Sequence, residues 1–268
     1  MKFSMQLPAM VIEPAGEFQT AQAVREITMQ MEASGVHACW VTDHPAPAAD
    51  WLRDARGHDA IDPFVALAAA AACTNRLQLH INLLVLPYRN PFLTAKAVAS
   101  LEVLSGSRTI LGVGSGYLEG EFAALGVDFR QRGKLTDEAL ETMMLAWSGE
   151  DVVKQGMNFD ARGNLARPFP PRKPAIWIGG VADKSLERVV KWGNGWLPIF
   201  GPNDPGKFRK AQKLLGSLDD LKAGVARLNE MLEAAGRTDP VDVSVNLPMA
   251  IGEPSASEAQ RVLDAVHA

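Results

Sequence analysis

The sequence predicts an α/β fold, a (β/α)8 barrel in which parallel strands alternate with helices. Three observations support this prediction. Short apolar segments alternate with segments of helical periodicity along the 268 residues. The apolar segments are hydrophobic at nearly every position, as strands are when both faces of a parallel sheet are covered. Polar residues and glycines gather where several strands end, which is typical of the mouth of a barrel.

Seven strands are predicted, bounded by turn residues or by helices. They cover residues 2–7, 38–42, 77–86, 108–113, 175–178, 195–199 and 241–246. Eight helices follow from apolar residues at a helical spacing, and Asp62 with Pro63 marks the start of one of them. They cover residues 20–33, 63–73, 91–104, 119–125, 136–147, 184–191, 218–235 and 257–266. The stretch between the helix ending at 147 and the strand starting at 175 is predicted as a loop with a proline-rich run.

The competing architecture is an open, doubly wound sheet, whose binding residues would concentrate at one switch point. Here at least five strand–helix units contribute such residues, so the barrel is favoured. We expect a single domain over residues 1–268, with an insertion at about 117–174 between the fourth and fifth strands. The eighth strand and helix are not found in the sequence: either a tail is missing or the barrel is incomplete.

The composition argues against several classes of function. A net charge of −4, without long runs of one sign, argues against a surface for nucleic acid or an anionic membrane. No apolar stretch is long enough to span a bilayer, and no signal peptide is recognised. Cys39 and Cys73 lie in apolar segments, which indicates two buried thiols in a reducing cytoplasm. The five histidines have no metal-binding spacing, so no metal site is expected.

Two glycine-rich strand ends each allow a ligand-binding and a structural interpretation. The run GVGSG at 112–116 is not a dinucleotide-binding fingerprint, because Tyr117 stands where the third glycine would be. Its glycines indicate that the backbone closely approaches either a helix or a ligand. Gly179 and Gly180 come between a strand and a helix, where backbone N–H groups could bind a phosphate. A tight turn without a ligand explains them equally well.

Asp43 and His44 close the second predicted strand. A histidine at this end of a barrel strand could transfer protons, because its pKa lies near neutrality. It could also be a loop residue with a structural partner. Trp177 and Trp196 could line a pocket for a planar ligand or pack in the core.

Five segments in this order resemble the bacterial-luciferase-like flavin oxidoreductases, particularly the branch that depends on the deazaflavin coenzyme F420. They are WVTDH at 40–44, NLLVLPYRNP at 82–91, ILGVGSGY at 110–117, IWIGG at 176–180 and GWLP at 195–198. LSGSR at 104–108 and DEAL at 137–140 also match. The resemblance covers residues 1 to about 198 and extends more loosely to 268. It implies a (β/α)8 barrel, in agreement with the element order.

The resemblance also implies roles for single residues. His44 would be the catalytic group for proton transfer, and Asp43 would contact the coenzyme. Asn82 and Leu83 would form a bulge, often with a cis peptide bond, that backs the coenzyme ring. Further coenzyme contacts would come from Ser115, Gly116, Gly179, Gly180, Val181 and Trp196. Tyr117 departs from the family's sugar-phosphate dehydrogenases, which carry a catalytic glutamate there, and Asn82 stands where glycine is frequent.

Three functions are compatible with this resemblance. The first is hydride transfer between reduced coenzyme F420 and a small organic substrate. The second is an FMN-dependent monooxygenase that uses O2, and the third is a barrel that binds flavin without turnover. A homodimer is expected, because the alanine-rich helix at 63–73 offers a flat apolar face to a partner; that helix could also pack only on its own barrel.

Overall fold

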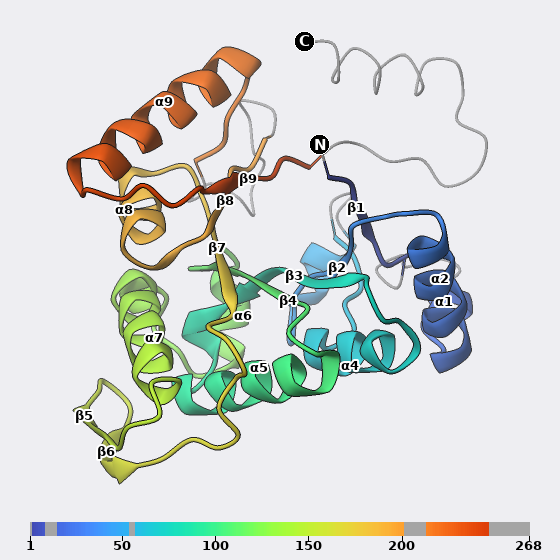
Figure 1. The fold of residues 1–268 in the computed structure, drawn as a ribbon, viewed down its shortest axis with the longest axis horizontal. Helices are drawn as coiled ribbons and strands as arrows, with labels where there is room; N and C mark the ends of the chain where they lie inside the picture. The colour runs from blue at the N-terminus through green and yellow to red at the C-terminus, as the bar shows by residue number, and fades with distance from the viewer. Residues whose placement is uncertain (1, 9–14, 54–56, 201–212, 247–268) are drawn as a thin grey trace. The chain divides into compact units, whose positions relative to one another are not determined.

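The computed structural model describes residues 2–8, 15–53, 57–200 and 213–246. The chain divides into two compact units, residues 1–179 and 180–268. Each unit contains parallel strands and covering helices (Figure 1).

The first unit is built on five parallel strands in the order β1-β2-β3-β4-β7. These strands are β1 (Ser4–Gln6), β2 (Ala38–Val41), β3 (Gln78–Val85), β4 (Thr109–Gly114) and β7 (Ala175–Gly179). Neighbouring strands are parallel because a helical connection returns the chain to the same edge of the sheet each time. Cys39, Leu79 and Leu111 are fully buried and form part of the core of this unit.

Helices of the first unit pack along the sheet in sequence order, α2 against α4, α4 against α5 and α5 against α7. The helices are α1 (Ala15–Phe18), α2 (Ala21–Ala33), α3 (Ala49–Leu52), α4 (Pro63–Cys73), α5 (Pro91–Ser105), α6 (Glu119–Ala124) and α7 (Arg132–Ala146). Two 3-10 turns, Leu86–Tyr88 and Phe129–Gln131, complete the set. The predicted helix start at Asp62 is confirmed, because its Oδ1 accepts hydrogen bonds from the N–H groups of Phe64 and Val65.

The stretch between α7 and β7 differs from the loop that the sequence predicts. It contains an antiparallel hairpin of β5 (Val152–Gln155) and β6 (Asp160–Asn164). The hairpin leaves no continuous apolar pattern in the sequence, because only Val152 and Ala161 of its strand residues are buried. It lies within the predicted insertion at 117–174, and the domain limits stay a prediction.

Two charged side chains, buried Arg108 and partly exposed Glu32, hold the amino edge of the five strands. Arg108 donates hydrogen bonds to the Thr74 hydroxyl and to four backbone carbonyl groups, those of Ala71, Thr74, Leu77 and Ser105. The Glu32 carboxylate accepts hydrogen bonds from three consecutive N–H groups, those of Asn75, Arg76 and Leu77. These contacts tie the ends of α2, α4 and α5 to the starts of β3 and β4.

The cysteine prediction is confirmed for one residue and wrong for the other. Cys39 is buried, and burial raises the pKa of its thiol to about 12. Cys73 is partly exposed, because it is the last residue of α4.

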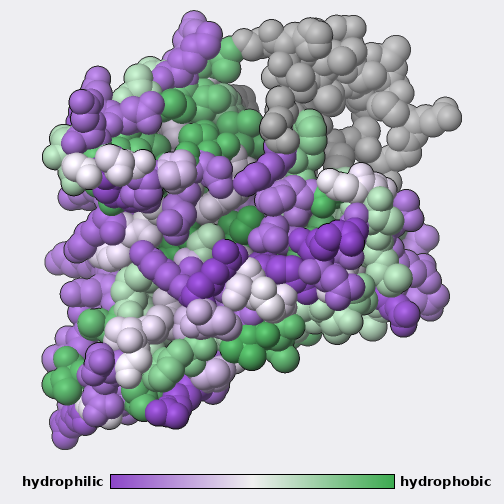
Figure 2. All heavy atoms as spheres, in the orientation of Figure 1, coloured by the Kyte–Doolittle hydropathy of each residue, from purple (hydrophilic) through white to green (hydrophobic). Residues whose placement is uncertain are grey.

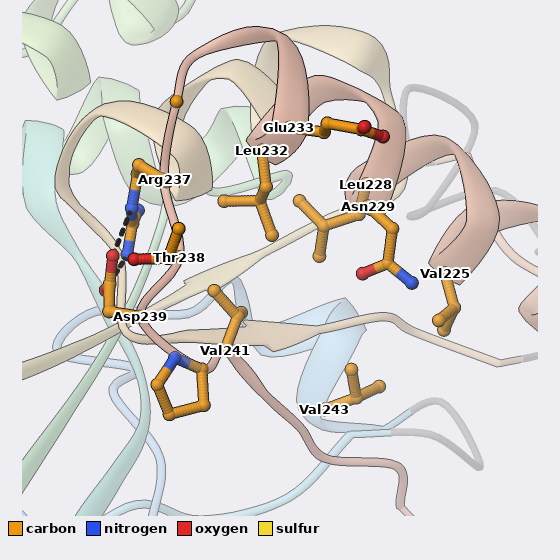
Figure 3. Close-up of a pocket in the computed structure, with 12 residues that line it drawn as sticks. Val225, Leu228, Asn229, Leu232, Glu233, Arg237, Thr238, Asp239, Val241 and Val243 are labelled. Carbon is orange, nitrogen blue, oxygen red and sulfur yellow. Dashed lines mark hydrogen bonds and ion pairs between the residues drawn. The ribbon is translucent and has the colours of Figure 1, made fainter.

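The second unit contains α8 (Asp183–Trp192), β8 (Gly195–Leu197), α9 (Leu218–Ala234) and β9 (Asp242–Val243). β8 and β9 pair in parallel. Arg237 donates hydrogen bonds to three carbonyl groups at the end of α8, those of Val189, Val190 and Gly193, and pairs with Asp239. A pocket of about 390 Å³ lies between α9 and the segment leading to β9. Figure 3 shows Leu228, Leu232 and Val241 around it.

Each of the seven predicted strands is found, and the predicted helix at 257–266 lies outside the described residues. No helix in the described ranges is long and apolar enough to cross a membrane.

Candidate active site

Four predicted site residues of the first unit lie in or just after the carboxyl halves of parallel strands. Asp43 comes after β2, Asn82 lies in the second half of β3, Ser115 follows β4 and Gly179 ends β7. The register pairs Val85 with Gly114 and Val113 with Ile178, which aligns these strand ends. The structure therefore brings these residues to one edge, as the sequence predicts; their coenzyme contacts stay a prediction.

The predicted irregularity in the third strand is confirmed. The Asn82–Leu83 peptide bond is cis, and the register between β3 and β4 shifts between Ile81 and Leu84. Leu83 packs over glycine in two neighbouring strands. A Cβ atom on Gly114 would lie 2.7 Å from Leu83 Cδ1, and one on Gly179 would lie 2.4 Å from Leu83 Cδ2. A side chain at either position would therefore force the end of the Leu83 side chain to move.

Gly116 and Ser115 stand just beyond β4. Gly116 has a φ of +76°, and a Cβ atom there would lie 2.6 Å from Val85 Cγ1 and 2.8 Å from the Phe122 ring. The Ser115 hydroxyl accepts a hydrogen bond from Thr136 Oγ1 at 2.9 Å. Gly116 is thus required by close packing within the protein, which is one of the two interpretations that the sequence left open.

Asp43 is 2% exposed and binds the segment that follows β3. Its Oδ1 accepts a hydrogen bond from the Arg89 guanidinium at 2.8 Å, and its Oδ2 accepts one from the Val85 N–H at 3.1 Å. Burial raises the pKa of Asp43, and the ion pair with Arg89 opposes part of this rise. Asp43 therefore positions the backbone and side chains immediately after the bulge.

His44 is bound to Glu121, a residue of α6 that sequence reasoning missed. The His44 Nδ1 lies 3.2 Å from Glu121 Oε2, which also accepts a hydrogen bond from the Tyr88 hydroxyl at 2.9 Å. Glu121 Oε1 accepts a hydrogen bond from the Ala46 N–H at 3.0 Å. Burial raises the pKa of Glu121, but these hydrogen bonds outweigh burial and lower its pKa below the ordinary value.

Aromatic rings surround the His44 imidazole. The ring centroids of Trp51, His58 and Tyr117 lie 4.6, 5.0 and 6.2 Å from that of His44. Trp51 is 1% exposed, and the side chain of His44 is 6% exposed. Among the described residues, His44 forms its hydrogen bond through Nδ1, and Nε2 has no partner. The imidazole is therefore held firmly while one nitrogen stays available.

His80 is a second buried histidine with a different environment. It lies in β3, and its ring packs against Trp177 at a centroid distance of 5.0 Å. Neither ring nitrogen has a hydrogen-bond partner among the described residues, and burial lowers the pKa of His80 to about 3. His80 therefore stays neutral at physiological pH, and of these two buried histidines only His44 is bound to a carboxylate.

The remaining predicted site residues, Gly180, Val181 and Trp196, belong to the second unit. Gly180 has a φ of +107°, and its carbonyl accepts a hydrogen bond from Trp196 Nε1 at 2.7 Å. Trp196 is 1% exposed and packs on Gly224 of α9. Val181 leads to α8, whose N-cap residue, Ala182, offers no side-chain cap. A coenzyme contact by these residues stays a prediction.

A signal for Glu121 exists in the sequence. Leu118, Phe122 and Leu125 are spaced as one apolar face of a helix, and Glu121 lies three residues after Leu118 and four before Leu125. A carboxylate on an otherwise apolar helix face indicates a buried partner, because a buried charge must be paired. Tyr88 and Arg89 belong to the segment 82–91 that carries the resemblance, but nothing in their spacing reveals their partners.

A parallel α/β fold with a histidine–carboxylate pair at the carboxyl edge of its strands is the arrangement in which barrel enzymes place their active sites. Comparison with known proteins gives the family. The family model described as luciferase-like monooxygenase matches residues 1–268. The chain belongs to the luciferase-like oxidoreductase and monooxygenase family.

Individual relatives carry different names. An uncharacterised protein of Mycobacterium tuberculosis is 33% identical over 189 residues, which cover 70% of this chain and 60% of that protein. The F420-dependent glucose-6-phosphate dehydrogenase of Kineococcus radiotolerans is 29% identical over 236 residues, covering 86% and 64%. The crystal structure of the monooxygenase RslO1 from Streptomyces bottropensis has a TM-score of 0.74 at 22% identity, covering 100% of this chain and 79% of that one. This chain spans about three fifths of the curated relatives that it matches first.

The likeness to the RslO1 structure, together with the family match, confirms the predicted fold, a luciferase-like α/β barrel.

Proposed function

We propose that this protein is an oxidoreductase that transfers a hydride between the deazaflavin coenzyme F420 and a small organic substrate. The observation that carries the proposal is the His44–Glu121 pair at the carboxyl edge, on the same edge as the Asn82–Leu83 bulge. Membership of the luciferase-like family and the similarity to an F420-dependent dehydrogenase support the choice of chemistry.

The residues at this edge fit a planar coenzyme. The Leu83 side chain packs directly against Gly114 of β4 and Gly179 of β7. These contacts fix the position of the Asn82–Leu83 bulge. The Gly180 N–H donates to the Leu197 carbonyl at 3.1 Å, so it is not available to a phosphate. The phosphate contact that the resemblance assigns to the segment before α8 stays a prediction. When bound, the coenzyme supplies the hydride chemistry, and the protein supplies orientation and proton transfer.

Each residue then has a task. His44 accepts or donates the proton at Nε2, because Nδ1 is bound to Glu121. Asp43 holds the segment after the bulge through Arg89 and Val85. The aromatic rings of Trp51 and Tyr117 restrict water around the imidazole. Tyr117 in place of a glutamate argues against a sugar phosphate as the substrate.

The alternative function is an FMN-dependent monooxygenase that uses O2. The likeness to the monooxygenase RslO1 over the whole of this chain favours this alternative. A barrel that binds flavin without turnover is the third possibility. The same edge and the same histidine would serve the first two functions, because both need an isoalloxazine-type ring and proton transfer.

Binding titrations with F420 and FMN, side by side, test the proposal. Each coenzyme is followed by its absorbance and fluorescence as purified protein is added. We expect F420 to bind at least about tenfold more tightly than FMN, a difference of about 1.4 kcal/mol. Tighter binding of FMN, with O2-dependent turnover of the reduced form, would support the monooxygenase. Binding without turnover of any substrate under either condition would support the third possibility.

We also propose that the outer faces of α4 and α5 form a homodimer interface. Val65 of α4 and Leu93 and Leu104 of α5 are 66% to 71% exposed. Figure 2 shows hydrophobic surface over α5 at the lower edge of the view. Sedimentation equilibrium of the wild type and of Leu93→Glu tests this: a dimer that the variant converts to a monomer is expected. A wild-type monomer at micromolar concentration contradicts it.

A further inference from the structure

The Glu121 carboxylate is saturated with hydrogen-bond donors. It accepts from His44 Nδ1 and the Tyr88 hydroxyl at Oε2 and from the Ala46 N–H at Oε1, and its side chain is fully buried. The lowered pKa of Glu121 keeps it ionised at neutral pH. An ionised carboxylate only accepts hydrogen bonds, so every group that faces it must donate.

We propose that Glu121 is a positioning residue that fixes the tautomer of His44, with the proton on Nδ1 and the lone pair of the neutral imidazole on Nε2. Because Nδ1 must donate to the carboxylate, Nε2 is the nitrogen without a proton in the neutral ring. Nε2 is also the nitrogen that has no partner among the described residues. Glu121 thus determines which nitrogen exchanges the proton with the reacting groups. This inference rests on the proposed function for its role in turnover, while the tautomer itself is a property of the free protein.

Tyr88 has a different part in the same cluster. Its hydroxyl donates to Glu121 Oε2, and its ring packs against Phe122 at a centroid distance of 4.6 Å. Burial, together with the charge of Glu121, raises the pKa of Tyr88, so the hydroxyl stays protonated. The Tyr88 hydroxyl donates to Glu121 and not to the imidazole, so it orients the carboxylate and does not select the tautomer.

The backbone N–H of Ala46 makes the proposal sharply testable. A backbone N–H can only donate, so in Glu121→Gln the amide oxygen must face Ala46. The amide NH2 group then faces His44 and Tyr88. Imidazole Nδ1 and the Tyr88 hydroxyl can both act as acceptors, so they can accommodate the NH2 group. The isosteric variant is therefore expected to move the proton of His44 from Nδ1 to Nε2.

Nitrogen-15 NMR of the imidazole in the coenzyme-free full chain tests this, because protonated and unprotonated ring nitrogens have well-separated shifts. The signals of His44 are assigned by their loss in His44→Gln. We expect an unprotonated Nε2 in the wild type and an unprotonated Nδ1 in Glu121→Gln. Tyr88→Phe should keep the wild-type tautomer, and Glu119→Gln, an exposed change on the same helix, should leave the spectrum unaltered.

The turnover rate supplies the second measurement. A wrong tautomer should lower kcat in Glu121→Gln by roughly 10²–10⁴-fold with little change in KM. A wild-type His44 with its proton on Nε2 would overturn the proposal without any variant, as would an unchanged tautomer in Glu121→Gln. If the tautomer switches as expected but neither coenzyme supports turnover of any substrate, the proposed function fails and the positioning role of Glu121 stands.

Discussion

The two edges of the five-stranded sheet use charged side chains in opposite ways. At the amino edge, Arg108 donates to four backbone carbonyl groups and Glu32 accepts from three backbone N–H groups. At the carboxyl edge, Asp43 and Glu121 bind mainly side chains, those of Arg89, His44 and Tyr88. A charged side chain bound to backbone groups stabilises the fold. A carboxylate bound to a titratable ring can instead determine which ring nitrogen carries the proton.

Substitution of His44 should have the largest effect. We expect His44→Ala to lower the rate of turnover by roughly 10²–10⁴-fold, the usual contribution of a proton-transfer group. Coenzyme affinity should change little, because we expect it to come mainly from apolar contact with the coenzyme ring, which His44 does not supply. Rates from stopped-flow absorbance and Kd values from fluorescence titration separate the two quantities. A loss of affinity in proportion to the loss of rate would make His44 a binding residue.

Substitution at the amino edge should act on stability alone. Arg108→Met removes five hydrogen bonds and leaves buried carbonyl groups without donors. The free energy of unfolding should fall by about 3 kcal/mol. Urea denaturation followed by circular dichroism measures this change. Val103→Ala, at an exposed position of α5, is the control and should change stability by less than about 0.5 kcal/mol.

Substitution of Asp43 should lower both coenzyme affinity and the turnover rate, each by less than the loss of turnover in His44→Ala. In Asp43→Ala, Arg89 and the Val85 N–H lose their acceptor, so the segment after the bulge is no longer held. Coenzyme affinity and turnover rate should each fall by roughly tenfold, or about 1.4 kcal/mol. Parallel titration and steady-state kinetics check this. An unchanged Kd would show that the segment is positioned by other contacts.

The last effect, which appears only in acid, concerns the pH dependence of stability. Burial lowers the pKa of His80 to about 3, below the value of about 6.5 for an unfolded chain. The unfolded state therefore binds a proton that the folded state excludes. The stability that depends on neutral His80 is present above pH 6.5 and is lost as the pH falls from there toward 3. The slope should reach about 1.4 kcal/mol per pH unit, and His80→Phe should remove this contribution from urea-denaturation curves.

Much of the fold could be predicted from the sequence, because buried parallel strands and their helices have distinct apolar patterns. The limits of α4 are those predicted, since Asp62 and Pro63 fix its start. The β5–β6 hairpin could not be predicted, because most of its side chains face solvent and carry no such pattern.

The site could be predicted only in part. The resemblance identified His44 and the irregular Asn82–Leu83 segment, and the structure supplied their neighbours. Glycine in the runs at 112–116 and 176–180 is explained at Gly114, Gly116 and Gly179 by contacts with Leu83, Val85 and Phe122, which no local pattern reveals. Glu121 lies 77 residues from His44 along the chain, so their pairing depends on the fold.

A single-turnover measurement tests the contrast between the two edges most directly. The rate of hydride transfer is measured with saturating F420 for the wild type, His44→Ala and Arg108→Met, at a temperature where all three are folded. We expect a fall of at least about 10²-fold for His44→Ala and a rate within about threefold of the wild type for Arg108→Met. Equal rates for His44→Ala and the wild type, or an equal loss in both variants, would contradict it.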